Sequence, residues 1–298
     1  MFIQIEKMKN TQFLIFSVAV ALFISSCTKQ ELELVKGNNP PPDSTQSSSV
    51  RREFIDKTFI ILTGREADNN EFNWADSLLL TENFTKESKV TIAEYVTALP
   101  EFLSNEYQQN IINQLDGAVN DMDITNDIAL YSSLLMDNAY AFFHSILLYE
   151  KNRLVAFQTA KTKFLNGEIG WSELYRTTIN TNYFDDLNMG SLNYVIATYQ
   201  LFYQRNPIES EIDASVAMID GLNNVLYAIN GSSKDDFLII FFEQPAYYEG
   251  QVRILFNRLL LRNPTTEEQS YYTNLYLQSQ NHRLIISKIV STNEFIQL

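Results

Sequence analysis

The chain has 298 residues, of which 45% are hydrophobic and 19% charged, so it holds enough apolar material for one or two cores. Nine glycines and seven prolines are few for this length, which disfavours collagen-like, glycine-rich and turn-dense β architectures and favours an all-α fold. The 36 acidic and 22 basic residues give a net charge of −14, which repels a phosphate backbone. We therefore expect no nucleic-acid partner.

The N-terminus has the pattern of a secretory signal. A polar start with Lys7 and Lys9 precedes a largely apolar run over residues 13–24, which is too short for the about 20 residues of a membrane span but fits a signal-peptide core. The run ends in Ile24-Ser25-Ser26-Cys27, which resembles a bacterial lipobox. We therefore expect residues 1–26 to be a lipoprotein signal peptide and Cys27 to be lipidated. Because Cys27 is the only cysteine, an intrachain disulfide and a cysteine metal cluster are excluded.

The segment after the lipobox is predicted to be a lipidated flexible tether over residues 27–50. It is rich in proline, serine and asparagine and has no apolar periodicity. Several acyl chains on one cysteine suffice for stable attachment to a lipid bilayer. We therefore expect the protein to bind the bilayer through acylated Cys27. Glu31 and Glu33 resemble the export signals of Bacteroidota surface lipoproteins. We expect an outer-membrane lipoprotein on the cell surface, with the periplasmic face as the alternative.

Three segments of the folded region match one another without gaps. They start at Phe59, Tyr199 and Phe256 and share an aromatic residue, five residues, arginine, one residue, alanine or proline, three residues and glutamate. Each unit closes on an aromatic phrase, and the three phrases are Pro100-Glu-Phe102, Pro245-Ala-Tyr247 and Asn293-Glu-Phe295. The shared charged positions are Arg65 and Glu71, Arg205 and Glu211, and Arg262 and Glu268.

The shared motif predicts a helix–turn–helix corner. Apolar residues before each arginine recur at helical spacing, and Pro207 and Pro264 end the first helix of their copies. Asp68 with Glu71 and Thr265 with Glu268 have the spacing of a capping box, which Ile208 breaks in the middle copy. We place each arginine at the C-terminal end of its helix, where it can pair with a carbonyl or the following glutamate. A structural clasp therefore explains the three arginines better than an anion site.

These corners predict three or four tandem helix-pair units that form a bundle or short array. Residues 51–190 would hold the first repeat and a long helical region, and residues 191–298 two tandem repeats. Residues 111–190 are either an insert or a decayed repeat. Apolar positions from Ile128 to Tyr149 predict one extended helix, which Gly167 and Gly170 stop before another helix begins at Trp171. The apolar run 237–242 is assigned to a helix from its place in the repeat.

The corner motif, the stretch from Asn166 to Tyr175 and the Asn293-Glu-Phe295 ending together resemble the phycobilisome linker polypeptide domain and its bacterial relatives of unknown function. The resemblance covers roughly residues 50–298 and implies an all-helical bundle that holds other proteins together. Linker proteins of that family are typically basic, whereas this chain is acidic and carries a lipobox. We therefore transfer no binding residues and no pigment-binding role.

Signatures of catalysis and of cofactor or metal binding are missing from the sequence. His144 and His282 are the only histidines, and no nucleophile elbow, phosphate loop or zinc motif is present. The acidic stretch 116–127 lacks the glycine and glutamate of a calcium loop and is interpreted as a solvated linker. We expect no catalytic residue, cofactor or metal.

The leading functional hypothesis is a non-catalytic module that binds or scaffolds another envelope protein. Exposed aromatic residues would mark the partner surface, and we expect one tyrosine of Tyr247-Tyr248 and one of Tyr271-Tyr272 to be exposed. The alternative is a surface glycan-binding or glycan-processing accessory protein. Trp74 and Trp171 lie at core-like helical positions, which disfavours that alternative.

Overall fold

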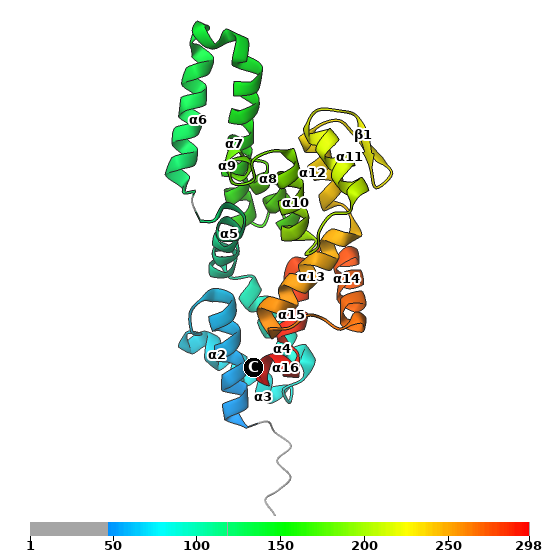
Figure 1. The fold of residues 1–298 in the computed structure, drawn as a ribbon. Helices are drawn as coiled ribbons and strands as arrows, with labels where there is room; N and C mark the ends of the chain where they lie inside the picture. The colour runs from blue at the N-terminus through cyan, green and yellow to red at the C-terminus, as the bar shows by residue number, and fades with distance from the viewer. Residues whose placement is uncertain (1–46, 118, 298) are drawn as a thin grey trace, which may run out of the picture. The chain divides into compact units, whose positions relative to one another are not determined.

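The computed structural model describes residues 47–117 and 119–297, so the predicted signal peptide, Cys27 and nearly all of the predicted tether lie outside the described residues. The described part contains fifteen α-helices, one 3-10 helix and one two-stranded sheet. The predicted all-α fold is confirmed. Figure 1 shows the helices following one another along the chain.

Each repeat consists of three helices that are closed by the first turn of a fourth, rather than of the helix pair that the sequence predicts. The first repeat comprises α2 (Ser48–Thr63), α3 (Asn69–Thr81), α4 (Lys86–Thr97) and the start of α5 (Pro100–Leu115). The middle repeat comprises α10 (Ser191–Phe202), α11 (Glu209–Ile219), α12 (Lys234–Phe242) and the start of α13 (Pro245–Leu260). The third comprises α13, α14 (Thr266–Ser279), α15 (His282–Val290) and α16 (Asn293–Gln297).

The closing aromatic residues explain why each repeat needs a fourth helix. Phe102, Tyr247 and Phe295 are all completely buried, at equivalent places in the first turns of α5, α13 and α16. The run 237–242 lies in α12, which confirms the helix predicted from its place in the repeat. The middle repeat also carries an antiparallel hairpin of β1 (Asn224–Leu226) and β2 (Ile229–Gly231), with Leu226 opposite Ile229.

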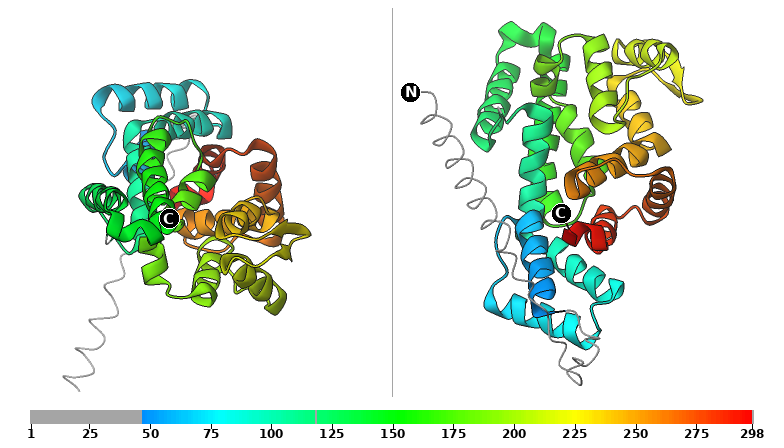
Figure 2. Two further views of the ribbon diagram at one scale, coloured as in Figure 1. Left: turned by 90° about the horizontal axis from the view of Figure 1, so that it is seen from above. Right: turned by 60° about the horizontal axis from the view of Figure 1, so that its bottom comes forward.

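The first and third repeats pack against each other although they lie at opposite ends of the described chain. Helix α4 runs against α15, and α2 contacts α16. Lys89 Nζ donates to Asn293 Oδ1 at 2.8 Å across this contact. Figure 2 shows the red C-terminal helices beside the blue and cyan helices of the first repeat.

Helices α10 and α13 approach so closely that one position admits only glycine. A Cβ atom on Gly250 would lie 1.9 Å from the carbonyl oxygen of Phe202. Because backbone cannot yield as a flexible side chain can, the contact requires glycine at this position. Gly250 therefore fixes the distance between the first helix of the middle repeat and the first helix of the third.

The predicted single extended helix between the first and middle repeats is wrong. The chain instead forms α6 (Asp121–Met136), the 3-10 helix η1 (Asn138–Phe143) and α7 (His144–Leu165), and α6 and α7 lie side by side as an antiparallel hairpin (Figure 1). Asp137 causes the break, because its backbone is extended and its side chain accepts a hydrogen bond from the amide of Ala139 at 2.9 Å. Thus Asp137 ends one helix and caps the next.

The base of this hairpin packs on neighbouring helices, because α7 contacts α5 and the helix that begins at Trp171. Ile124, Leu154 and Phe157 are buried there. The chain then passes through α8 (Trp171–Ile179) and α9 (Asn182–Leu187), so the helix predicted from Trp171 begins where expected but is broken after Ile179. Asp185 of α9 pairs with both Arg153 of α7 and Lys234 of α12.

Burial of the aromatic residues differs from the expectations at several positions. Trp171 is buried as predicted and stacks on His282 with 4.5 Å between ring centroids, whereas Trp74 is 39% exposed. His282 is buried at the start of α15. Both residues of the Tyr247-Tyr248 pair are buried. Of the other pair, Tyr271 is exposed and Tyr272 is buried.

Candidate functional site

The three sequence-matched corners have one hydrogen-bonding geometry. In each, two guanidinium nitrogens of the arginine donate to the two carboxylate oxygens of the glutamate six residues later, at 2.6–2.8 Å. The same arginine donates at 3.0 Å to the carbonyl of the residue that follows it. The glutamate also accepts from the backbone amide three residues before it, at 2.8–2.9 Å. Each corner is therefore a closed loop of hydrogen bonds.

The motif aromatic completes the corner from the preceding helix. The guanidinium carbons of Arg65, Arg205 and Arg262 lie 5.7, 5.3 and 5.3 Å from the ring centroids of the aromatic residues six positions earlier. Each arginine lies two or three residues beyond the end of its helix, so it does not occupy the last helical turn as predicted. Ile208 lacks a side-chain acceptor, and only the glutamate half of the capping box forms in the middle copy.

A second carboxylate ties the corner to the closing helix in two of the three copies. Glu101 accepts from Arg65 Nε at 3.2 Å, and Glu294 accepts from Arg262 Nε at 2.6 Å. The middle copy has Ala246 at that position of its closing phrase. There the hydroxyl of Tyr227, from the β1–β2 turn, donates to Glu211 at 2.6 Å instead.

The electrostatics of the corners favour a structural role. Arg262 lowers the pKa of Glu268 to about 2, and the hydrogen bond from Arg205 opposes burial to keep the pKa of Glu211 below its usual value. Each carboxylate is thereby held ionised beside a permanently charged arginine. A bound anion would have to displace a glutamate from every arginine. The corners consequently hold helices together rather than present cations to a ligand.

The acidic stretch 116–127 and the two histidines do not form a metal site among the described residues. Within residues 47–117 and 119–297, no group of three or more histidine, aspartate or glutamate side chains could hold a metal ion. In the acidic stretch, Asp116 ends α5 and Asn120 caps α6. His282 Nδ1 is 2.7 Å from the Tyr276 hydroxyl, and burial lowers the pKa of His282 well below its ordinary value. His282 is therefore a neutral core residue.

The far half of the α6–α7 hairpin is the most unusual surface of the described molecule. We call residues 128–149 the hairpin tip; among its 22 residues the only charged side chain at neutral pH is Asp137. No described residue from 125 to 152 is buried. Phe142 is 91% exposed and Met136 is 86% exposed. Their large apolar neighbours that are also exposed are Leu130, Tyr140, Phe143, Ile146, Leu148 and Tyr149.

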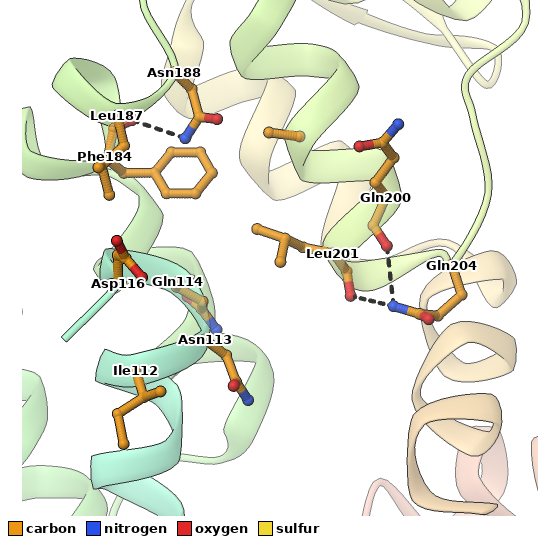
Figure 3. Close-up of a pocket in the computed structure, with 11 residues that line it drawn as sticks. Ile112, Asn113, Gln114, Asp116, Phe184, Leu187, Asn188, Gln200, Leu201 and Gln204 are labelled. Carbon is orange, nitrogen blue, oxygen red and sulfur yellow. Dashed lines mark hydrogen bonds between the residues drawn. The ribbon is translucent and has the colours of Figure 1, made fainter. Parts of the chain in front are cut away.

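A second feature is a cleft of about 440 Å³ between α5 and α10, with α9 at one end (Figure 3). Amide side chains line both walls, and Leu187 and Leu201 form an apolar part of the surface. A smaller chamber of about 90 Å³ between α5, α8 and α13 shares Asn113, Gln114 and Leu201 with the cleft and so adjoins it. We call the two together the amide cleft.

Comparison with protein-family models, with curated proteins and with solved structures finds no match for this chain. No helix in the described part of the chain has both the length and the apolar character that a membrane span needs. The hairpin tip and the amide cleft are therefore the two candidate sites.

Sequence reasoning found the corners but neither surface. The run of 22 residues with one charge was present in the sequence, yet its spacing was interpreted as the apolar face of one extended helix. The density of asparagine and glutamine in residues 105–114 was the available signal for the cleft.

Proposed function

We propose that this protein is a non-catalytic, lipid-anchored module of the cell envelope that binds another protein through its hairpin tip. The observation that carries the proposal is the exposed, almost uncharged surface of the tip. Protein interface cores are depleted in charged residues and enriched in aromatic residues and methionine, which describes this surface. Contiguous exposed apolar patches of several hundred Å² mark interaction sites in soluble domains.

The size of the patch supports a specific interface. With about 150–250 Å² for each large side chain, the exposed fractions of the eight apolar residues add up to on the order of 800 Å². A standard interface buries about 800 Å² on each partner. The tip alone therefore offers enough surface for a stable complex, provided that the partner covers both helices of the hairpin.

The charge of the apex favours a protein over the lipid bilayer as the occupant of the tip. Asp137 lies at the turn between the two helices and is held there by its bond to the Ala139 amide. Insertion of the tip into hydrocarbon would carry this carboxylate with it, at a cost of several kcal/mol. The rest of the hairpin, residues 121–127 and 150–165, carries four acidic and four basic residues, so it adds no net attraction to anionic headgroups. A protein surface can leave Asp137 at a hydrated rim.

In this proposal the protein contacts the bilayer through the expected acyl chains on Cys27, not through the tip. The partner that fits the tip presents an apolar face of one or two helices, which pack along α6 and α7 as in a helical bundle. Such a partner needs no cationic surface, because the tip offers it only one charge.

Photo-crosslinking from defined positions in living cells tests the proposal. A photoreactive phenylalanine analogue at position 142 should form one discrete adduct with a second protein, and the adduct should disappear when Met136→Ser and Ile146→Ser are added. Leu222 is the matched control, because it is apolar and 62% exposed but lies outside the hairpin. Adducts with lipid alone, or equal adducts from positions 142 and 222, would contradict a protein-binding tip.

A further inference from the structure

The amide cleft contains buried polar atoms that lack a partner within the described protein. Asn110 Oδ1, Gln114 Oε1 and Gln251 Nε2 make no hydrogen bond there, and their residues are 3, 6 and 1% exposed. All three residues line the chamber between α5 and α13. A buried polar atom without a partner costs about 1–3 kcal/mol. Their convergence on one cavity indicates a site that a polar molecule fills.

Three amides of the cleft donate from their NH₂ groups to other protein atoms, and no described residue donates to their oxygens. Asn188 Nδ2 donates to the carbonyl of Phe184, and Gln204 Nε2 donates to the carbonyls of Gln200 and Leu201, as Figure 3 shows. Gln200 Nε2 likewise donates to Asn206 Oδ1. The walls of the cleft are therefore rich in hydrogen-bond acceptors.

The chamber shows the same bias toward acceptors. Asn110 Nδ2 donates at 2.8 Å to Thr178 Oγ1, whose own proton goes to the carbonyl of Leu174. The Thr178 hydroxyl can then only accept, which fixes the Asn110 amide with its oxygen toward the chamber. The residues that line the chamber thus contribute two unpartnered oxygens, on Asn110 and Gln114, and one unpartnered donor, on Gln251.

Charge at the site excludes an ionic ligand. The two ionic residues of the chamber, Glu106 and Arg258, neutralise each other at 2.9 Å. Asp116 is the only charged residue among those that line the larger cavity, and one carboxylate among amides is a poor site for a divalent cation. The ligand should be neutral and should carry more hydrogen-bond donors than a peptide backbone, which offers N–H and C=O in equal number.

We propose that the amide cleft binds a neutral carbohydrate chain. Sugar hydroxyl groups would donate to the amide oxygens of the walls, and the apolar C–H face of a ring would pack on Leu187, which is 49% exposed, and on Leu201. One hydroxyl-bearing group would enter the chamber, where it accepts from Gln251 Nε2 and donates to Asn110 or Gln114. This site is separate from the hairpin tip, so either proposal can fail without the other.

Calorimetric titration of the full-length, detergent-solubilised protein tests the site. The probes are neutral gluco-, manno-, galacto- and xylo-hexaoses, with a neutral hexapeptide as the competing class. We expect at least one hexaose to bind and the peptide not to bind. Gln114→Met in the chamber and Gln200→Leu at the exposed wall should each weaken binding by about tenfold, the loss of one or two hydrogen bonds.

Gln108→Leu is the matched control, because Gln108 is an exposed amide of α5 that lines neither cavity. Its affinity should equal that of the unmodified protein. Gln200 is exposed, so its variant remains informative even where Gln114→Met fails to fold. The proposal is overturned when no hexaose binds at millimolar concentration, when the peptide binds in its place, or when binding survives both cleft substitutions.

Discussion

Replacement of Arg262 by methionine should destabilise the fold by about 2 kcal/mol. Arg262 has five N–H donors, and all five are used: two go to Glu294, two to Glu268 and one to the carbonyl of Asn263, at 2.6–3.0 Å. The arginine lowers the pKa of Glu268 from 4.5 to about 2, which corresponds to about 3 kcal/mol of interaction. Because about a third of each side chain is exposed, solvent screening reduces this figure to about 2 kcal/mol.

Urea unfolding followed by circular dichroism at neutral pH measures this loss. The matched control is Arg283→Met, because none of the described residues forms an ion pair with Arg283, and this substitution should change the free energy of unfolding by less than about 0.5 kcal/mol. A double-mutant cycle with Glu268→Gln should return a coupling energy of about 1 kcal/mol or more. Strict additivity of the two substitutions, or equal unfolding midpoints for both arginine variants, would refute the clasp.

Three further predictions follow from single residues. Gly250→Ala should lower the unfolding free energy by about 3 kcal/mol or more, measured by urea titration, because its Cβ would overlap the Phe202 carbonyl; Gly170→Ala, with open space around it, is the control. Ala246→Glu should raise the melting temperature, since it would restore to Arg205 the second carboxylate that the other two corners have, at about 0.5 kcal/mol. Burial holds the pKa of His282 well below 6.5, so just below that pH only the unfolded chain takes up a proton. Stability should therefore be full above pH 6.5 and fall by up to about 1.4 kcal/mol per pH unit just below it, and His282→Gln should abolish this first part of the slope.

The corners were predictable from the sequence because their determinants are local. Each glutamate lies six positions after its arginine, and the residues that cap the second helix lie between them. The sequence also located the closing phrases and the helix over 237–242, but it did not show that a glutamate of the closing phrase binds the corner arginine. Glu101 and Glu294 join their arginines from 36 and 32 residues away, through a stretch of variable length.

Both candidate surfaces were missed because they depend on tertiary contacts. Apolar spacing in residues 128–149 specifies a helix face but not whether another element covers it, and Asp137 divides that face between two helices. The amide cleft joins α5 to α10 and α13, which are far apart in sequence. Amide side chains that line a cleft have no characteristic spacing in the sequence, unlike metal ligands or catalytic groups. No sequence motif therefore predicts such a site.

The repeats and the region between the first and middle repeats differ in how many of their buried polar atoms have a hydrogen-bond partner. Each corner arginine finds its carboxylate within its own repeat. Of the nine buried side-chain atoms without a partner in the described residues, six belong to residues 110–182. The same region supplies the exposed hairpin tip and one wall of the amide cleft. Exposed apolar side chains and unpaired buried amides both cost free energy that a bound partner can offset. The repeats therefore provide the scaffold, and the region between the first two of them is where recognition should be sought.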